Sequence, residues 1–376
     1  MKIAAAELRR IHLPLREPFK IAYNTWTSMP SLILRLETDT DLVGWGESVP
    51  DEGVTGETIE GVYATLAERL LPELIGHDAF AIEEFHERAG KAINGGYAAK
   101  AAIDLALFDL KGQSCNQPLY QMLGGNTNVV TAPAVLGMTA PQALKDSLLE
   151  YMAAGYTHYK LKLGGGWAED CRRVALARET LGDGATIKVD ANQGWGTWDM
   201  ALKVIRSIEP YNIELVEQPV RHWDFAGLQR VRQNSPIPIM VDEGVCDARD
   251  LLRLILAGGI DWVNIKLMKC GGILPATKMA ALAEAAGIKV QVGSMLESSI
   301  GSLAGAHLHR AQSCIKSSEM VGPRWFSQDI GDFRYQGCQV VFSDRPGLGV
   351  EIDEDMLKRL TVSGVRIEQS GARPLP

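Results

Sequence analysis

The segment "HYKLKLGGGW", residues 158–167, reads as a buried β-strand that runs into a glycine-rich turn. It carries Lys160 and Lys162 two positions apart, so the alternation of side chains along a strand places both ammonium groups on one face. Similar β-rich runs recur along the chain and alternate with amphipathic helical segments that end at a glycine. The runs cover residues 129–135, 158–164, 186–192, 213–219, 237–243, 261–268, 289–296 and 314–320. Eight strands separated by helices predict parallel βαβ units closed into a (β/α)8 barrel.

The two ends of the chain lack this alternation. Residues 1–126 offer strands at 31–39 and 42–49 followed by long helical segments, which indicates a separate α+β domain. Residues 339–376 show no βα rhythm and are expected to pack back on that domain, which leaves residues 127–338 for the barrel. An open doubly wound sheet is the alternative architecture, but no G-x-G-x-x-G turn follows the first strand. The barrel is therefore favoured.

Charged side chains interrupt the strands at the ends where a barrel builds its active site. The charges that recur about one βα unit apart are Asp190, Glu217, Asp242 and Lys266. Converging carboxylates repel each other unless a hard divalent cation binds them, and Mg²⁺ prefers such oxygen ligands. The three carboxylates are therefore predicted metal ligands. Asp242 is chosen over Glu243 because alternation along a strand lets only one of two neighbours face inward.

Two lysines complete this pattern. Lys162 and Lys266 lie on strands at opposite sides of an eight-stranded ring, and a neighbouring cation lowers the pKa of a lysine toward neutrality. Such a pair can take a proton from one face of a carbon acid and return it to the other, while the metal stabilises the enolate. Each residue alone has a plainer explanation: a solvated strand end, a turn or cap residue, or a structural ion pair between Lys160 and Asp190. Six charges in register on five strands favour the functional interpretation.

Composition excludes several other classes of protein. The chain has 376 residues and a net charge of −8, and no long basic run suggests nucleic acid as a partner. No run approaches the roughly 20 apolar residues of a membrane-spanning helix, and the first residues are too charged for a signal peptide. The six cysteines include no C-x-x-C pair, so reduced thiols are expected. A cytoplasmic enzyme that binds neither nucleic acid nor membrane is the resulting expectation.

Several motifs resemble the enolase superfamily, in particular its muconate-lactonizing subgroup. They are "KLK" at 160–162, "VDANQGW" at 189–195, "ELVEQP" at 214–219, "MVDE" at 240–243 and "NIKLMKCGGI" at 264–273. The resemblance implies a (β/α)7β barrel whose mouth is covered by an N-terminal α+β capping domain that the C-terminal tail completes. It also implies Mg²⁺, replaceable by Mn²⁺, at the three carboxylates. Lys162 and Lys266 would form the acid/base pair, and Lys160 would assist Lys162.

The same resemblance implies which residues surround the substrate. Asn192 and Glu297 would line the site, and two loops of the cap, "FKIAYNTWTSM" and "VPDEGVTGET", would contact the distal part of the substrate. Tyr23 and Trp26 in the first loop suggest an apolar or aromatic distal group, unless they only pack the cap. A small-molecule carboxylate is the expected partner, and a homo-oligomer is the expected working form.

A few positions distinguish the dipeptide epimerases of the subgroup from its muconate cycloisomerases. Dipeptide epimerases typically carry Asp-x-Asp on the eighth strand, where it holds the dipeptide ammonium. This chain has "SEMVGP" there, with Glu319 first and Val321 second, so Glu319 would contact the substrate. Asn24 stands where Ala-Glu epimerases carry an arginine. The resemblance therefore implies a racemase or epimerase of another dipeptide or N-substituted amino acid. A muconate-type cycloisomerase is the alternative, because "SSEMVGP" and "ESSIGSLAGAHL" are closer to those enzymes. A catalytically silent barrel is disfavoured by the complete set of carboxylates and lysines.

Overall fold

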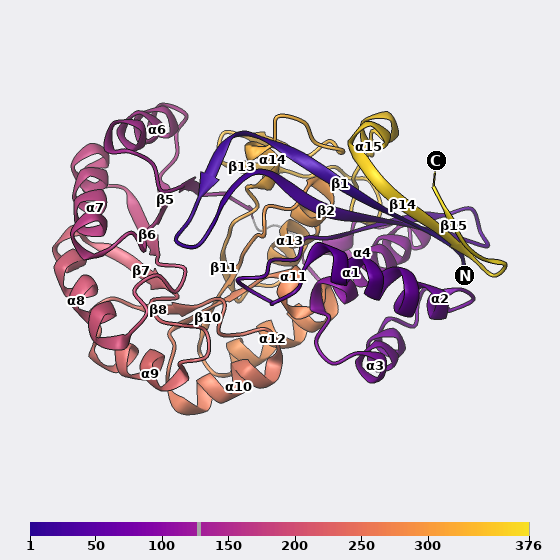
Figure 1. Ribbon diagram of the computed structural model, residues 1–376, viewed down its shortest axis with the longest axis horizontal. Helices are drawn as coiled ribbons and strands as arrows, with labels where there is room; N and C mark the ends of the chain where they lie inside the picture. The colour runs from indigo at the N-terminus through magenta and orange to yellow at the C-terminus, as the bar shows by residue number, and fades with distance from the viewer. Residues whose placement is uncertain (126–128, 376) are drawn as a thin grey trace.

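Eight parallel strands form the centre of the larger part of the molecule (Figure 1). The computed structural model describes residues 1–125 and 129–375. The strands are β4 (Ala134–Leu136), β5 (His158–Lys162), β6 (Thr186–Asp190), β7 (Ile213–Glu217), β8 (Ile239–Val241), β9 (Trp262–Ile265), β10 (Lys289–Val292) and β11 (Ile315–Ser318). They are hydrogen-bonded in chain order, and each overlaps one predicted run. The predicted strand pattern is confirmed.

The sheet curls round on itself. Lys188 on β6 donates to Gln291 Oε1 on β10 at 3.2 Å and to Ser317 Oγ on β11 at 3.0 Å. In a flat sheet with roughly 4.8 Å between neighbours, strands this far apart in the order would be about 20 Å from each other. The two ends of the sheet also meet, because Ser318 Oγ donates to Thr131 O at 3.3 Å. The architecture is therefore a barrel and not an open sheet.

Helices cover the outside of this barrel (Figure 1). The long ones are α6 (Pro141–Ala153), α7 (Trp167–Leu181), α8 (Trp198–Ile208), α9 (Phe225–Asn234), α10 (Ala248–Ala257), α12 (Ile273–Ala285) and α13 (Ser299–Ala311). The short ones are η2 (Glu209–Tyr211), α11 (Leu267–Cys270) and α14 (Gly322–Trp325). Strand β11 is followed only by the four-residue α14 and the hairpin β12 (Arg334–Gln336) and β13 (Gln339–Val341). The (β/α)7β form is thus correct, and the eighth complete βα unit predicted from the strand count is not present in the described residues.

The remaining elements build a second part around an antiparallel sheet. Its strands are β1 (Ile3–Lys20), β2 (Thr25–Thr38), β3 (Val43–Ser48), β14 (Thr361–Glu368) and β15 (Gly371–Pro374), in the order β15-β14-β1-β2-β3. Its helices are α1 (Ile59–Thr65), η1 (Leu66–Leu70), α2 (Leu71–Leu74), α3 (Ile82–Ala92), α4 (Tyr97–Ser114), α5 (Leu119–Met122) and α15 (Glu354–Leu360). Because β14 pairs with β1, the C-terminal tail completes the capping domain as expected. The expected boundary at 126/127 lies outside the described residues, and that at 338/339 falls between β12 and β13.

Strand β1 was not among the predicted strands, because several charged residues interrupt its apolar pattern. It pairs with β2 along most of its length, and the two form a long ribbon that reaches from the cap across the barrel (Figure 1). The connection between them, residues 21–24, therefore lies over the barrel mouth. This ribbon brings cap side chains to the ends of the barrel strands.

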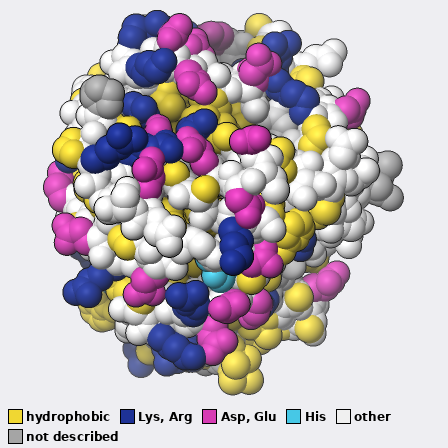
Figure 2. Space-filling model, turned by 90° about the vertical axis from the view of Figure 1, so that its right-hand side faces the viewer, with side chains coloured by type: hydrophobic (Ala, Val, Ile, Leu, Met, Phe, Trp, Pro, Cys, Tyr) yellow, Lys and Arg dark blue, Asp and Glu magenta, His cyan; other side chains and the backbone are white. Residues whose placement is uncertain are grey.

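Basic and acidic side chains are interspersed on the face shown in Figure 2, without a large area of one sign. All six cysteines are free, as expected. Within the described residues, none of the helices combines the length and the apolar character needed to cross a membrane.

Candidate active site

The carboxyl ends of β5, β6 and β7 bring three charged residues to one level. The strand register pairs Lys162 with Asp190 and Asp190 with Glu217. All three side chains are buried. The equal spacing along the sequence thus becomes a row of adjacent charges across the sheet.

Lys160 occupies the centre of a carboxylate cluster. Its Nζ lies 3.0 Å from Asp190 Oδ2, 2.7 Å from Glu217 Oε2 and 2.7 Å from Glu319 Oε1. Burial on its own lowers the pKa of Lys160, but the surrounding carboxylates outweigh burial and hold this pKa well above its usual value. Without a cation beside it, Lys160 is therefore held as a positive charge between the three carboxylates.

The two predicted proton-transfer lysines each contact a different carboxylate. Lys162 Nζ donates to Asp190 Oδ2 at 2.7 Å, and Lys266 Nζ lies 2.7 Å from Asp242 Oδ2. Burial favours a neutral Lys266, yet Asp242 and then Glu243 raise its pKa above the usual value. This is opposite to the lowered pKa expected from the sequence, because that lowering requires a cation to take over the negative charge of Asp242.

The alternation of side chains along a strand does not decide which of Asp242 and Glu243 is the metal ligand. Strand β8 ends at Val241, so both carboxylates follow the strand, and both are buried. Asp242 lies between Lys266 and Lys269, whose Nζ is 2.8 Å from Asp242 Oδ1. Glu243 accepts from Asn192 Nδ2 at 3.1 Å, and burial, followed by the charge of Asp242, raises the pKa of Glu243 to about 7. The argument from period-two alternation is therefore wrong here, although the two residues still differ in their partners.

The oxygen atoms at these strand ends suit a hard cation. The buried side-chain oxygens that make no hydrogen bond include four at the ends of β6, β7 and β8, namely Asn192 Oδ1, Glu217 Oε2, Asp242 Oδ2 and Glu243 Oε2. Lys160 lies at ion-pair distance from Glu217 Oε2, and Lys266 from Asp242 Oδ2. Among the described residues, no three Asp, Glu, His or Cys side chains are already gathered to chelate an ion, because ammonium groups separate the carboxylates. The donor chemistry fits Mg²⁺, and binding requires the lysines to withdraw.

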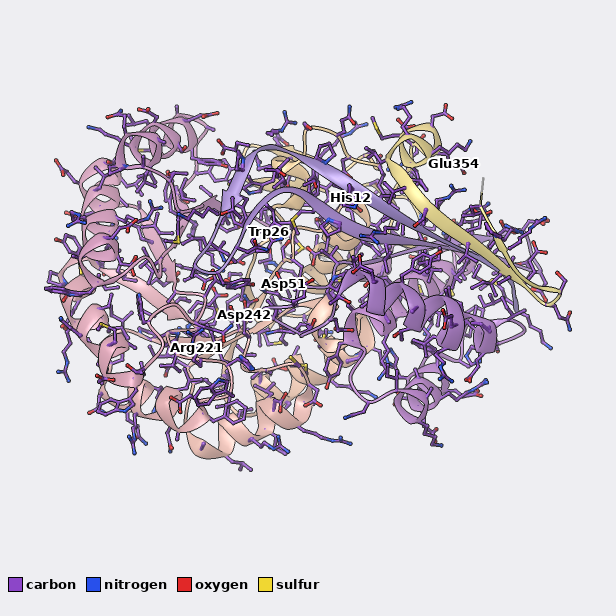
Figure 3. The ribbon with its side chains drawn as sticks, in the orientation of Figure 1. His12, Trp26, Asp51, Arg221, Asp242 and Glu354 are labelled. Atoms are coloured by element: carbon purple, nitrogen blue, oxygen red, sulfur yellow. The ribbon has the colours of Figure 1, made fainter. Side chains whose placement is uncertain are left out.

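A cavity lies between these strand ends and the cap. From the barrel it is lined by Lys162, Lys266 and Asn192, and by Ser294, Met295 and Leu296 after β10. From the cap it is lined by Phe19, Ile21, Tyr23, Trp26, Met29, Asp51 and Val54. Figure 3 shows Trp26 and Asp51 of the cap on the side of the barrel that carries Asp242. Both predicted lysines and both predicted aromatic residues thus face one cavity.

The cap side of the cavity contains an acid that was not singled out in the sequence. Tyr23 OH donates to both oxygens of Asp51 at 3.3 Å, and the ring of Tyr23 meets that of Trp26 edge-on at 6.1 Å. Burial is the main cause that raises the pKa of Asp51. The acid belongs to the second predicted cap loop, but only the fold shows that it faces Lys162 and Lys266.

Two predicted substrate-binding residues do not line this cavity. Glu319 lies deeper, where it contacts Lys160 and accepts from Gln291 Nε2 at 3.0 Å. Glu297 accepts from Ser294 Oγ and from Met295 N at 2.9 Å. Glu319 thus belongs to the ion cluster under the cavity, and Glu297 shapes the loop that forms the wall.

Sequence reasoning also missed two residues that hold the carboxylates. Lys269 is fully buried and donates to both Asp242 and Asn264 O. Asn264 Nδ2 donates to Glu217 Oε1 at 2.8 Å. A second lysine three positions after Lys266 was the available signal, but only the turn at α11 aims it back at Asp242.

Two known family profiles match this chain. Residues 5–124 match the family profile of the mandelate racemase/muconate lactonizing enzyme N-terminal domain, and residues 143–356 match the enolase C-terminal domain-like profile. The chain belongs to the mandelate racemase/muconate lactonizing enzyme family of the enolase superfamily. This confirms the family, the barrel and the capping domain predicted from the motifs.

Relatives within this family narrow the reaction class. The chain is 42% identical over 363 residues to the N-succinyl-L-Arg/Lys racemase of Bacillus cereus, covering 96% of this chain and 98% of that protein. The crystal structure of that racemase has a TM-score of 0.96, over 98% of this chain and all of that one. A dipeptide epimerase of Enterococcus faecalis, complexed with Mg and L-Leu-L-Tyr, is 38% identical with a TM-score of 0.90, over 93% of this chain and 100% of that one. Chloromuconate cycloisomerase of Pseudomonas putida is 32% identical over 374 residues, covering 97% of this chain and 100% of that protein. The chain is accordingly an isomerase, and the racemase or epimerase interpretation is supported.

Proposed function

We propose that the protein is a Mg²⁺-dependent racemase or epimerase of N-acylated amino acids or dipeptides. The observation that carries this proposal is that Lys162 and Lys266 line one cavity, from β5 and from the end of β9. Two bases on opposite sides of a carbon acid are what inversion at that carbon requires. The B. cereus racemase and the E. faecalis epimerase, as relatives, support the same class.

In this mechanism, the lysines divide the proton transfer between them. Bound at Asp190, Glu217 and Asp242, Mg²⁺ would supply positive charge that stabilises the substrate carboxylate and the enolate. One of Lys162 and Lys266 removes the α-proton, and the other returns a proton to the opposite face. The lysine that accepts the proton must first leave its carboxylate and become neutral.

The cap side of the cavity sets the preference for the distal group. The polar side-chain groups of its wall are the hydroxyl of Tyr23, the indole N–H of Trp26 and the carboxylate of Asp51. A buried carboxylate gains most from a cationic or hydrogen-bond-donating partner. We therefore favour a distal group that combines an aliphatic stem with a positive end, the type named for the B. cereus relative. An N-succinyl derivative of lysine or arginine is the first substrate to test.

Isotope exchange tests the reaction. The protein is incubated in D2O with Mg²⁺ and each enantiomer of N-succinyl-lysine, and loss of the α-proton is followed by NMR. Both enantiomers should exchange, Lys162→Ala and Lys266→Ala should each lose exchange from a different enantiomer, and Lys358→Ala on the exposed face of α15 should behave as wild type. Equal exchange of both enantiomers by Lys266→Ala would contradict the two-base mechanism.

A muconate-type cycloisomerase is the second candidate. It is favoured by Glu319 and Val321 at positions where dipeptide epimerases typically carry two aspartates, and by the identity to chloromuconate cycloisomerase. In a cycloisomerase only one lysine needs to transfer a proton. Loss of muconate absorbance with Mg²⁺ or Mn²⁺ detects this reaction and so separates the two candidates. Turnover of muconate without α-proton exchange in N-succinyl amino acids would replace the first candidate by the second.

Further properties follow from the same proposal. Mn²⁺ should replace Mg²⁺, because it also accepts oxygen ligands. Six free cysteines favour the reducing cytoplasm as the location of the protein. The proposed domain bounds are residues 1–126 for the cap, 127–338 for the barrel and 339–376 for the returning tail. A homo-oligomer is also proposed, with Trp198 and Trp223, which are 39% and 69% exposed, as candidate contact residues. Light scattering of the purified protein tests the oligomer, and a monomer would contradict it.

A further inference from the structure

The motif "VDANQGW" contains two residues that the proposed chemistry does not use, Gln193 and Gly194. They follow β6 directly after Asp190 and Asn192, and the backbone of Gln193 has a φ of 66°. Such a conformation is uncommon for a residue other than glycine and persists where the surroundings hold it. The side chain of Gln193 is buried, with 6% of its surface exposed. Gln193 is thus a buried glutamine with a strained backbone, close in sequence to the carboxylate of Asp190.

Gln193 joins a loop of the cap to a loop of the barrel. Its Nε2 donates to Gly53 O at 3.3 Å. Its Oε1 accepts from the backbone N of His222 at 2.9 Å, and the ring Nδ1 of His222 lies at the same distance. The loop of His222 follows β7, and its neighbour Arg221 is marked in Figure 3. One amide therefore ties the cap loop around Gly53 to the barrel loop that follows β7.

Gly194 receives the other cap loop. A Cβ atom on Gly194 would lie 2.7 Å from the Cα of Gly164 and 3.1 Å from the Cβ of Ala22. A Cβ atom on Gly164 would lie 2.7 Å from the same atom of Ala22. Neither position has room for a side chain, because Ala22, the carbonyl oxygen of Ala191 and the opposite glycine fill the space. The two glycines form a shallow notch, and the tip of the ribbon β1–β2 sits in it.

The two cap loops also hold each other. Tyr23 follows Ala22, and its ring covers Gly53. A Cβ atom on Gly53 would lie 2.6 Å from Cε2 of Tyr23. The hydroxyl of the same tyrosine donates to Asp51. Below them, Asn192 N donates to Asp190 Oδ1 at 2.9 Å. Asn192, Gln193 and Gly194 are therefore consecutive residues of the turn after β6. Asn192 is hydrogen-bonded to the candidate metal ligand Asp190, and Gln193 and Gly194 contact the two cap loops.

We infer that Gln193 is a positioning residue that holds the loop of Asp51 over the reacting lysines and thereby controls selectivity for the distal group. This inference rests on the proposed function, because it concerns the same cavity. Gln193 reaches neither the cavity nor the lysines, so it acts through Gly53 and the loop. Gly194 provides the seat for the neighbouring loop. The role of Gln193 is to preorganise the substrate-contacting loops and not to transfer a proton.

Hydrogen exchange of the full-length protein without substrate tests the docking itself. Gln193→Glu keeps an acceptor for His222 but removes the donor to Gly53 O, and Gln193→Met removes both. Backbone amides of residues 49–58 should exchange about threefold faster or more in both variants, while β6 and β7 stay protected. Gln229→Glu on α9 is the matched control, because Gln229 Nε2 also donates to a backbone carbonyl, that of Ala257, away from the cap. Unchanged exchange in residues 49–58 of both Gln193 variants would overturn the inference.

A pair of substrates then tests selectivity. Exchange of the α-proton is measured for N-succinyl-L-lysine and N-succinyl-L-alanine, which differ in the distal group. Gln193→Glu should raise KM for the lysine derivative by about tenfold and for the alanine derivative much less, with kcat affected less than KM in both. An equal effect on the two substrates would contradict a selective role. If the wild type exchanges neither substrate, the proposed function fails, while the hydrogen-exchange result still decides whether Gln193 docks the loop.

Discussion

At the scale of single residues, the cavity combines side chains that the sequence reveals with one that it does not. The lysines and carboxylates at the strand ends stand out because charges are rare in buried parallel strands. Asp51 does not stand out, because an acid in a polar loop is ordinary. It becomes significant only because it faces Lys162 and Lys266 across the cavity.

Replacing Asp51 tests its role in substrate preference. Asp51→Asn keeps the size of the side chain and a partner for Tyr23, but it removes the negative charge. We expect kcat/KM for N-succinyl-L-lysine to fall about tenfold, equivalent to about 1.4 kcal/mol, and that for N-succinyl-L-leucine to fall much less. Steady-state racemisation rates check this. A uniform decrease would show that Asp51 supports the loop and does not select the substrate.

His307 makes stability depend on pH. It is buried on α13, where Nδ1 accepts from Tyr120 N at 3.2 Å and Nε2 donates to Leu348 O at 2.9 Å. Both ring nitrogens are thus used by the neutral form, and burial lowers the pKa of His307 from 6.5 to about 4. Between these values the unfolded chain binds the proton and the folded chain does not, so stability falls as the pH drops through this window.

Urea unfolding at neutral pH and at about pH 5 should show this loss, of the order of 2 kcal/mol from His307. His307→Gln can keep both hydrogen bonds without titrating, and it should show a correspondingly smaller loss. His158→Gln at the exposed start of β5 should retain the full pH dependence. His309, whose pKa burial also lowers to about 4, accounts for part of the remaining loss in the first variant.

At the scale of elements, the ends of strands decide where the charges point. Strands β5, β6 and β7 each end on a charged residue, and their register aligns these residues. Strand β8 ends at Val241, one residue before Asp242. Alternation applies only inside a strand, which is why Asp242 and Glu243 are both buried. The pattern of the sequence predicts the strands well and their last residues poorly.

The contact between α4 and β3 is a second feature at this scale. A Cβ atom on Gly46 of β3 would overlap the carbonyl oxygen of Ala102 on α4. Gly46→Ala should therefore lower the free energy of unfolding by about 1–3 kcal/mol, since backbone atoms would have to separate. Gly90→Ala in α3, where nothing lies within 4 Å of the new atom, should raise it by about 0.5–1 kcal/mol. Chemical denaturation compares the two. Equal stabilities would show that α4 can shift without cost.

At the scale of the whole molecule, binding of a cation at the ends of the barrel strands should change the thermal stability of the protein. Millimolar Mg²⁺ should raise Tm by several degrees, because a ligand that binds only the folded state stabilises it. Asp242→Asn should lower Tm without Mg²⁺, since Lys266 and Lys269 lose their partner, and should abolish the rise with Mg²⁺. Asp199→Asn on the exposed face of α8 is the control. Differential scanning calorimetry checks both, and a full rise in Asp242→Asn would remove Asp242 from the ligand set.

The sequence by itself determined the barrel, the strands that carry charges and the family, because buried parallel strands have a strong apolar pattern that charged residues interrupt visibly. It left β1 undetected, since charged residues obscure its pattern. Only the tertiary structure decided that Asp51 faces the lysines, that Glu319 lies beneath Lys160 and that Gln193 supports the cap loop. These contacts join residues far apart in the chain. The contact of Glu319 with Lys160 forms when the barrel closes, and the other two form where the cap meets the barrel. Local patterns describe one element at a time, whereas a cavity between domains arises only when the elements pack together.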